Sequence, residues 1–574
     1  MKSTIMSRRD LEFLLYEWLH VEELTALDRF AEHSRETFDG VLELSEQLAT
    51  RYFAPHNKLS DANEPSFDGQ TVTLIPEVKA AWDAFAAADL LAMGMDAELG
   101  GAQLPAVVAQ AAFAWIAAAN VSTSGYLMLT IANANLLARF GSAEQIEDFV
   151  KPMLAGRFSG TMALSETQAG SSLADITTRA EPADDGSYRL FGSKMWISGA
   201  EHELTENIVN LVLAKIPGGP AGTKGISLFI VPKYLADGTR NGVAISGLNH
   251  KMGQRGITNT VLNFDGAVGY LVGEPHRGIV YMFHMMNEAR LGVGMGAVAL
   301  GYTGYLKSVQ YARERPQGRP LGVKDPTTPQ VPIIEHPDVK RMLLAQKAYV
   351  EGGLALGLYC AKLVDTGDTA LLDILTPVAK SWPSQWCLEA NNLAIQVHGG
   401  YGYTREYDVE QHYRDNRLNP IHEGTHGIQS LDLLGRKVTQ NGGASLMALG
   451  ERITVTVKAA REGAAVDLAD QLDAAWQRLA GVTAGMFAAG DVEAAMANSA
   501  VYLEAFGHIV VAWIWLEQLL AAEKADGDFS SDFYKGKRQA ARYFFRYELP
   551  RTAPQLDLLE SLDRTTLEMR DSWF

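Results

Sequence analysis

Residues 422–426 read His-Glu-Gly-Thr-His, and side chains of these types at this spacing can serve two different chemistries. The pattern H-E-x-x-H holds zinc in metalloproteases, where both histidines bind the metal and the glutamate is the general base. Zinc binding requires His422 and His426 on one face of a helix, one turn apart. Alternatively, Glu423 on a tight turn can take a proton from a substrate, because Gly424 lets the backbone approach a ligand closely.

The residues around this pentapeptide favour a turn over a zinc-binding helix. Pro420 stands just before it, and the glycine and threonine between the histidines are weak helix formers, glycine by about 1 kcal/mol relative to alanine. The pattern predicts a loop that enters a helix at Thr425, over residues 425–437. His398 and His412 could supply further ligands, but the extended zincin continuation with a third histidine is missing. We therefore expect no metal site, and a zinc metalloprotease is only a remote alternative.

The composition is ordinary for a soluble globular protein and argues against two kinds of partner. Of 574 residues, 47% are hydrophobic and 21% are charged, and the formal net charge is −18. This charge opposes non-specific binding to nucleic acid and to anionic membranes. The two cysteines, Cys360 and Cys387, form no C-x-x-C pair, so we expect reduced thiols and a cytoplasmic location. Residues 1–20 read as an amphipathic helix rather than a signal peptide, and residues 506–522 as a buried helix rather than a membrane span.

The elements that must position these residues change in type along the chain. Residues 1–158 carry apolar side chains at helical spacing, as in the expected helix 104–122 with Pro105 near its start. Short β-branched and aromatic segments separated by Gly, Pro, Asp and Asn then indicate a compact β domain. Helical patterning returns with 278–315, and a Gly- and Asn-containing linker at 439–445 precedes a final helical segment. The expected strands are 188–198, 207–216, 225–233 and 259–266.

Four motifs along the chain resemble the acyl-CoA dehydrogenase family. "MALSETQAGSS" (162–172), "KMWISGA" (194–200), "QVHGGYGYTREYDVE" (396–410) and "YRDNRLNPIHEGTHGIQ" (413–429) are similar to family motifs and occur in the family's order. The resemblance covers roughly residues 80–437. It implies a mainly α fold with a central β barrel. The implied domains are a helical domain with an extra N-terminal helix (1–158), a β-barrel domain (159–277), a four-helix bundle (278–438) and a helical C-terminal extension (445–574).

The same resemblance implies that the protein uses FAD to introduce a double bond between Cα and Cβ of an acyl-CoA thioester. Glu423 would be the base that removes the α-proton, because burial raises the pKa of a carboxyl above its usual value of about 4.3. The backbone N–H of Glu423 would stabilise the thioester oxygen, and Gly424 would leave room for the acyl chain. Some members carry the base directly before a helix arginine. Here that arginine is Arg290, Ala289 precedes it, and Glu288 lies about 100° round the helix.

The resemblance also implies contacts to FAD in two groups. The first group would contact the flavin and pyrophosphate from the β domain, although Trp196 could alternatively be barrel core. Its members are Met162, Leu164, Ser165, Gly170, Ser171, Trp196 and Ser198. The second group has two roles. Thr425 matches a flavin contact, and the other members would complete the FAD site of a neighbouring subunit. Its members are Arg315, Gln317, Gln396, Gly399, Gly400 and Thr425. Gly318 replaces the family's phenylalanine, so the chain departs from the family at the adenine end.

Substrate contacts and partners follow from the same resemblance. Asn287 and Arg290 are similar to a substrate-facing pair, with a solvated helix face as the alternative, and Ser171 and Gly424 would also touch substrate. The long ends resemble two long subgroups, the very-long-chain dehydrogenases and, more closely, the 3-methylmercaptopropionyl-CoA dehydrogenase-like enzymes. These long ends favour a homodimer. The resemblance also implies electron-transfer flavoprotein as the electron acceptor. Fatty-acid β-oxidation of a straight medium or long acyl-CoA is the first expectation, and 3-methylmercaptopropionyl-CoA the second.

Two relatives with different activities are weighed against this expectation. An acyl-CoA oxidase would share every flavin motif and react with oxygen instead. An alkylation-response flavoprotein of the superfamily would bind DNA and should carry a basic extension. In residues 445–574, however, acidic side chains outnumber basic ones by roughly six. We therefore expect no nucleic-acid partner.

Overall fold

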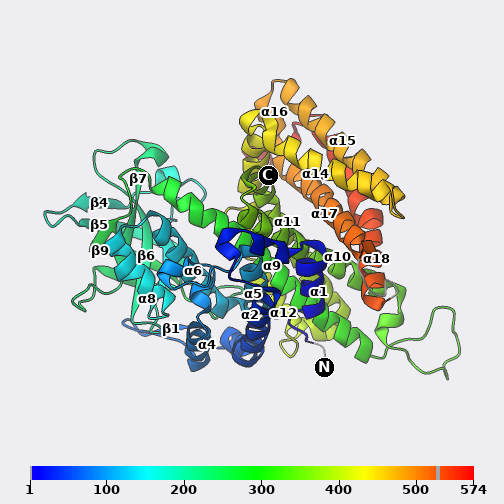
Figure 1. Cartoon of the computed structure of the whole chain (residues 1–574), viewed down its shortest axis with the longest axis horizontal. Helices are drawn as coiled ribbons and strands as arrows, with labels where there is room; N and C mark the ends of the chain where they lie inside the picture. Colours follow the sequence, from blue (N-terminus) through cyan, green and yellow to red (C-terminus); the bar gives the residue numbers. More distant parts are fainter. Residues whose placement is uncertain (1–2, 525–530) are drawn as a thin grey trace. The chain divides into compact units, whose positions relative to one another are not determined.

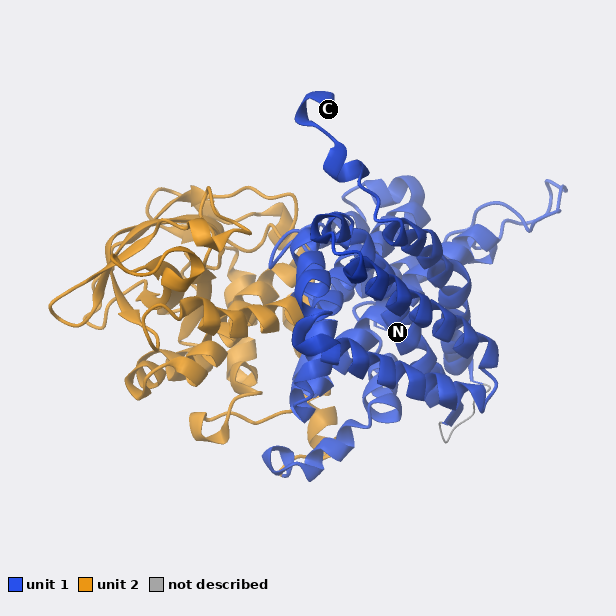
Figure 2. Ribbon diagram, turned by 90° about the horizontal axis from the view of Figure 1, so that it is seen from above, with its two compact units in different colours: residues 1–31, 106–111, 293–574 blue, residues 32–105, 112–292 orange. Residues whose placement is uncertain are grey.

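A computed structural model describes residues 3–524 and 531–574, and the chain forms two compact units (Figure 2). The first unit consists of residues 1–31, 106–111 and 293–574, and the second of residues 32–105 and 112–292. Helices dominate both ends of the chain, and strands occur in its middle (Figure 1). The helical, β, helical order expected from the sequence is therefore confirmed.

The second unit contains one seven-stranded sheet. Its order is β3-β6-β4-β5-β9-β7, β8 pairs with β9, and β6 pairs additionally with β7. The buried strand β6 carries apolar side chains on both faces, Val209, Leu211 and Leu213 on one and Ile208, Val212 and Ala214 on the other, as a strand covered on both sides should. The predicted β domain is present, while its closure into a barrel stays a prediction. The strands are β3 (Phe158–Ala163), β4 (Arg179–Pro182), β5 (Tyr188–Ser198), β6 (Asn207–Lys215), β7 (Ile226–Pro232), β8 (Val243–Leu248) and β9 (Asn259–Leu271).

A buried asparagine fixes a helix of the second unit against this sheet. The Asn133 side chain of α6 (Val121–Phe140) donates to the carbonyls of Thr161 on β3 and Val209 on β6, both at 2.9 Å. Gly160 is required here, because a β-carbon at that position would lie 2.6 Å from the β-carbon of Asn133. The other longer helices that begin in this half of the chain are α2 (Arg35–Leu48), α4 (Pro76–Ala87) and α5 (Ala106–Ala119), the last starting directly after Pro105.

The first unit is built around two long antiparallel helices that a tight turn joins. The turn uses Gly367 at φ +72°, and the Asp368 side chain caps the second helix by accepting from the Leu371 N–H. The bundle helices are α9 (Gly278–Glu314, which begins in the second unit), α10 (Pro337–Thr366), α11 (Thr369–His398), α12 (Val409–Asn416) and α13 (His426–Asp432). The C-terminal extension adds α14 (Ala444–Arg461), α15 (Val466–Ala488), α16 (Val492–Ala497), α17 (Ser499–Lys524), α18 (Asp532–Tyr543), α19 (Thr552–Glu560) and α20 (Thr565–Glu568).

Helix α17 is the apolar helix expected at 506–522. Among the described residues it alone has the length and hydropathy that could cross a membrane, and 83% of its most apolar window is buried inside the protein. Its Trp513 and Trp515 indoles donate to the Thr456 hydroxyl and the Ala348 carbonyl. These are the contacts of a core helix, because a buried indole N–H needs a partner.

A buried ionic cluster joins the extension to the rest of the first unit. Lys537 of α18 pairs with Asp10 of the N-terminal helix α1 (Arg8–Glu12) and, at 2.9 Å, with Glu351 of α10. The Tyr302 hydroxyl of α9 also donates to Asp10, at 2.8 Å. The extension is therefore held by charge pairs as well as by apolar packing.

Candidate active site

Glu423 lies on a strained turn between α12 and α13. Thr425 caps α13 by accepting from the Ile428 N–H at 3.3 Å, so the predicted helix entry at this threonine is confirmed. Glu423 has φ +53° and Gly424 has φ +89°. A left-handed conformation at a residue other than glycine costs about 1–3 kcal/mol and is most often kept at functional sites. A β-carbon at Gly424 would also lie 2.5 Å from the Gln429 amide nitrogen.

Side chains from two helices hold this turn through its backbone. Gln429 of α13 donates to the Glu423 carbonyl at 3.1 Å. Lys380 of α11 donates to the Gly424 carbonyl at 2.6 Å and to the Asn419 carbonyl at 2.8 Å. Both holding side chains are fully buried, and the Glu423 side chain itself is half-buried. Sequence reasoning missed Lys380 and Gln429, because their partners are backbone atoms distant in the chain.

The geometry contradicts the helix that zinc binding by His422 and His426 requires. His426 begins α13, whereas His422 lies before the helix with its Nε2 atom 3.0 Å from the Asn419 side-chain oxygen. Burial and, to a smaller extent, the Lys380 charge lower the pKa of His422 to about 3 and of His426 to about 4. That charge would also repel a divalent cation. In the part of the chain that the structure describes, no three His, Cys, Asp or Glu side chains gather in a metal-binding arrangement.

Several of the predicted second-group residues meet in one cavity of the first unit. Arg315, Gln317, Gly399 and Gly400 line a space of about 510 Å³. A β-carbon at either glycine would meet open space, so the backbone here is accessible to a ligand. Gln396, on the last turn of α11, and Thr425 do not line this cavity.

Aromatic side chains form part of the same cavity wall. Tyr311 stacks on His398 with ring centres 4.3 Å apart, and Arg315 lies 5.7 Å from the ring centre of Tyr401. Tyr401 is 45% exposed and also lines the cavity. The chain therefore presents exposed ring surface here although it lacks the family's phenylalanine at Gly318.

Trp196 of the second unit has an exposed side chain and an irregular backbone within strand β5. It has φ +67° and is 61% exposed, at a register irregularity of β5 between Lys194 and Ile197. A bulge of this kind re-aims a side chain, and positive φ is strained for tryptophan. The alternative interpretation of Trp196 as barrel core is therefore wrong.

A buried ion pair holds the segment beside Trp196. Lys194 donates to the Leu164 carbonyl at 2.8 Å and to the Glu166 carboxylate at 3.0 Å, and neither Lys194 nor Glu166 is exposed by more than 4%. The backbone N–H and hydroxyl of both Thr177 and Thr178 also donate to Glu166. Burial opposes its ionisation, but Lys194 and these donors lower the pKa of Glu166. The motifs contained both charged residues, but only the structure shows their pairing.

The other first-group residues lie on or near β3 and β5. Met162 and Leu164 are half-buried and pack against the apolar core, and the Ser165 carbonyl accepts from the Met195 N–H at 2.9 Å. Gly170 and Ser171 are exposed in the loop after β3. The hydroxyl of Ser198, the remaining member, accepts from the Asn259 side chain at 3.0 Å.

The predicted substrate pair lies on the part of α9 that belongs to the second unit. Arg290 is 4% exposed, so a solvated helix face is wrong for it, whereas Asn287 is exposed. Their side chains approach to 3.5 Å. Glu288 instead accepts from Asn135 of α6 at 3.2 Å, on another side of the helix.

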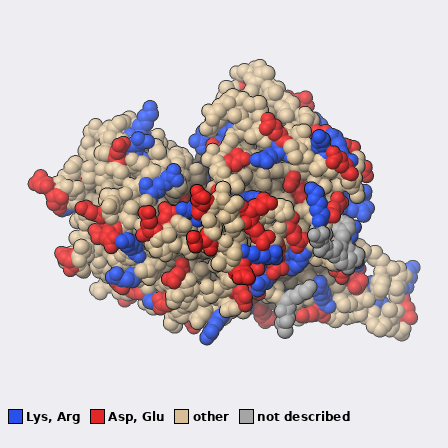
Figure 3. All heavy atoms as spheres, viewed as in Figure 1, with Lys and Arg blue, Asp and Glu red and all other residues tan. Residues whose placement is uncertain are grey.

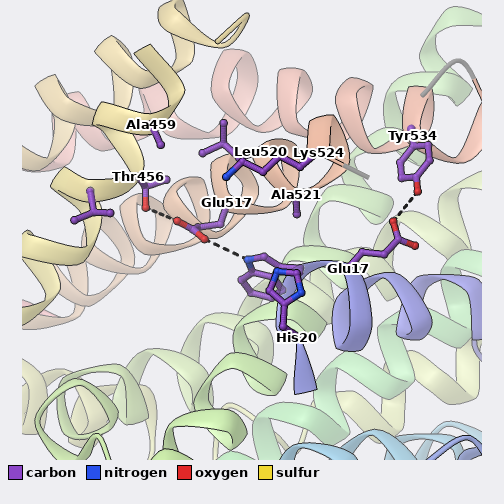
Figure 4. Close-up of a pocket in the computed structure, with 11 residues that line it drawn as sticks. Glu17, His20, Thr456, Ala459, Glu517, Leu520, Ala521, Lys524 and Tyr534 are labelled. Carbon is purple, nitrogen blue, oxygen red and sulfur yellow. Dashed lines mark hydrogen bonds between the residues drawn. The ribbon is translucent and has the colours of Figure 1, made fainter. Parts of the chain in front are cut away.

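Another cavity of the first unit has a volume of about 620 Å³ (Figure 4). The Trp18 indole and the Thr456 hydroxyl donate to its Glu517 carboxylate, and the Tyr534 hydroxyl donates to Glu17. Its two carboxylates are therefore satisfied by the protein. None of the predicted site residues lines it.

Comparisons with known proteins agree with the motifs across the chain. Residues 43–157, 161–267 and 276–438 match the N-terminal, middle and C-terminal domain families of acyl-CoA dehydrogenases. Residues 449–570 match the "Acetyl-CoA dehydrogenase C-terminal like" family. The chain belongs to the acyl-CoA dehydrogenase family of oxidoreductases, in its form with a C-terminal extension.

Individual relatives match nearly the full length. The 3-methylmercaptopropionyl-CoA dehydrogenase of Ruegeria pomeroyi is 36% identical over 93% of this chain and 94% of its own. The broad-specificity linear acyl-CoA dehydrogenase FadE5 of Mycobacterium tuberculosis is 33% identical over 99% of each chain. Among solved structures, an acyl-CoA dehydrogenase complexed with FAD from Bacillus anthracis has a TM-score of 0.74 at 19% identity and covers 94% of this chain and 93% of its own.

Proposed function

We propose that this protein is an FAD-dependent dehydrogenase that converts an acyl-CoA thioester to its trans-2-enoyl-CoA, with Glu423 as the base. The observation that supports this most is the turn at Glu423, a strained glutamate with its backbone held by two buried side chains. Such strain persists only where the surrounding structure over-determines it. The family membership of the chain supplies the reaction class.

The residues present fit FAD. The exposed and strained Trp196 offers a ring face, with Met162, Leu164, Ser165, Gly170, Ser171 and Ser198 near it in the chain and the sheet. Arg315, Gln317, Gly399 and Gly400 offer a cation and an open backbone cradle for phosphate oxygens. Gln396 and Thr425 complete the proposed set. When bound, FAD supplies the acceptor for the hydride that leaves Cβ.

The chain's own chemistry centres on the α-proton. The Glu423 carboxylate takes that proton, which a thioester releases only to a close and aligned base. The Glu423 N–H donates to the thioester oxygen and stabilises the charge that develops there. Gly424 leaves space beside the base, and Ser171, Asn287 and Arg290 bind the substrate.

Substituting Trp196 should separate flavin binding from stability. We expect Trp196→Gly to keep or raise the unfolding temperature, because glycine removes the strain of φ +67° and an exposed side chain buries little surface. The Kd for FAD should rise about fivefold or more, since a stacked aromatic contact contributes about 1 kcal/mol or more. Equilibrium dialysis and thermal unfolding measure the two effects. A Tyr188→Ala variant serves as control, because half-buried Tyr188 packs within the same sheet. Unchanged FAD affinity in Trp196→Gly would remove this residue from the proposed site.

The substrate we propose first is a straight-chain medium or long acyl-CoA. The relative from R. pomeroyi favours 3-methylmercaptopropionyl-CoA as the second candidate, because that protein is named for this substrate. A panel of straight acyl-CoAs of increasing length, with 3-methylmercaptopropionyl-CoA beside it and an artificial electron acceptor, distinguishes the two. Highest kcat/KM with the sulfur compound would overturn the first choice. Hydrogen peroxide formation as fast as turnover in air would indicate an oxidase.

Further properties are proposed from the resemblance. They are a homodimer, electron-transfer flavoprotein as acceptor, a role in β-oxidation, a cytoplasmic location, closure of the sheet into a barrel and the four domains bounded as above. Light scattering that gave a tetramer would count against the dimer.

On the face in Figure 3, acidic and basic side chains are interspersed, so this face has no continuous basic surface for nucleic acid.

A further inference from the structure

Lys380 ties together the two ends of the turn that carries Glu423. Its ammonium group donates to the carbonyls of Asn419 (2.8 Å) and Gly424 (2.6 Å), which stand four residues before and one residue after the glutamate. The side chain is fully buried on α11. A lysine is seldom fully buried unless its charge is used, because desolvating an ammonium is costly.

A second set of contacts holds the same turn without charge. Asn391 donates to the Leu300 carbonyl at 2.9 Å, Asn416 donates to Asn391 at 2.7 Å, and Asn419 donates to Asn416 at 2.8 Å. This series of hydrogen bonds ends at His422, whose Nε2 atom lies 3.0 Å from the Asn419 side-chain oxygen. These three amides are all buried, so the turn is anchored to α9, α11 and α12. Uncharged side chains thus also hold the turn, and Lys380 adds a positive charge beside it.

The charged and titratable groups around this turn leave Lys380 as its main source of charge. His422 and His426 remain neutral above pH 5, because burial and Lys380 lower the pKa of His422 to about 3 and of His426 to about 4. Arg417, after α12, also acts on His426 and is exposed to screening solvent. Asp415 of α12 is buried and hydrogen-bonds with Gln411 of its own helix.

Titratable groups on α10 and α17, which also pack on α11, lie on another side of that helix. His508 of α17 and Tyr349 of α10 contact Trp382, which lies about 200° round α11 from Lys380. Lys437, after α13, pairs at 2.8 Å with Asp373, about two turns earlier on α11.

We propose that Lys380 is a positioning residue for the base: it holds Glu423 in its left-handed conformation, and its ammonium charge favours the ionised, proton-accepting carboxylate. This proposal rests on the proposed function. An opposite charge nearby lowers the pKa of a carboxyl by about 1–3 units. Removing the cation therefore raises the pH at which the base becomes active.

The test compares Lys380→Met and Lys380→Arg in the FAD-loaded enzyme. The pH profile of the flavin-reduction rate has an acid limb, on which the rate rises as the base ionises. For Lys380→Met we expect this acid limb to shift to higher pH by at least about one unit. The rate should therefore be about tenfold lower on the acid side and should recover at alkaline pH. Lys380→Arg keeps the charge and should keep the limb at its wild-type pH. The KM for acyl-CoA should change little in both. If Lys380→Met fails to fold, Lys380→Gln, which retains a donor without charge, carries the same prediction.

A matched buried lysine controls for loss of stability. Lys537→Met removes a cation of similar burial that contacts Asp10, Glu351 and Gln518, so it should lower stability and leave the acid limb unchanged. Hydrogen exchange adds a readout without activity: amides of 418–429 should exchange faster in Lys380→Met but not in Lys537→Met. An unmoved limb in an active Lys380→Met enzyme would overturn this inference alone. A wild-type flavin that no acyl-CoA reduces would overturn the proposed function as well.

Discussion

Glu423→Gln should keep its FAD and lose about 10³–10⁴-fold in the rate of flavin reduction by acyl-CoA. The amide fills the same space on the turn but cannot accept the α-proton, and general base catalysis contributes about 10²–10⁴-fold. The loss should lie at the upper end, because Ala289 occupies the family's other base position and the neighbouring Glu288 accepts a hydrogen bond from Asn135. Stopped-flow absorbance of the flavin under anaerobic conditions measures the rate.

Two control measurements accompany this test. The FAD content and the unfolding temperature of Glu423→Gln should match wild type, since buried Lys380 and Gln429 hold the turn through backbone carbonyls and the amide fills the same space. Glu451→Gln on the exposed surface of α14 should reduce flavin at the wild-type rate. Wild-type rates in Glu423→Gln would show that another group is the base.

Lys194→Met should produce the largest loss of stability. The pair with Glu166 is fully buried, and removing one partner leaves an uncompensated charge, which costs about 3–5 kcal/mol. The segment Leu164–Ser165 also loses its anchor, so FAD affinity should fall with stability. Urea unfolding followed by circular dichroism, with and without FAD, measures both effects.

The partner substitution provides the control for Lys194. In the double variant Lys194→Met with Glu166→Gln no buried charge remains, and the backbone N–H and hydroxyl of Thr177 can still donate to the amide oxygen when it takes the place of Oε2. We therefore expect the double variant to be more stable than Lys194→Met alone, a coupling that a double-mutant cycle reveals. Strict additivity of the two losses would contradict a charge pair.

The sequence predicted elements well where the signal was local. Thr425 before "HGIQ" carries its own capping signal, and α13 begins at the following residue. The predicted helix 278–315 is α9, Gly278–Glu314, and the predicted strand 188–198 is β5. Each of these has its periodicity and its boundary residues within one segment of chain.

The features that position the site could not be predicted in the same way. Helix α11 contains Pro377 and Pro383, which local rules would read as breaks, and only burial among neighbouring helices makes it continuous. The strain at Trp196 and Glu423 runs against backbone preference, so no propensity indicates it. The buried pairs Lys194–Glu166 and Lys380–Gly424 join residues 28 and 44 positions apart.

The proposed reaction depends most on removal of the α-proton by Glu423 in an enzyme that holds FAD. The most direct measurement is anaerobic mixing of the yellow wild-type protein with a straight-chain acyl-CoA, unlabelled or carrying deuterium at Cα. We predict that the flavin absorbance bleaches and that α-deuteration slows the bleaching. A flavin that stays oxidised with every acyl-CoA in the panel, or a colourless protein that contains zinc, would contradict the account.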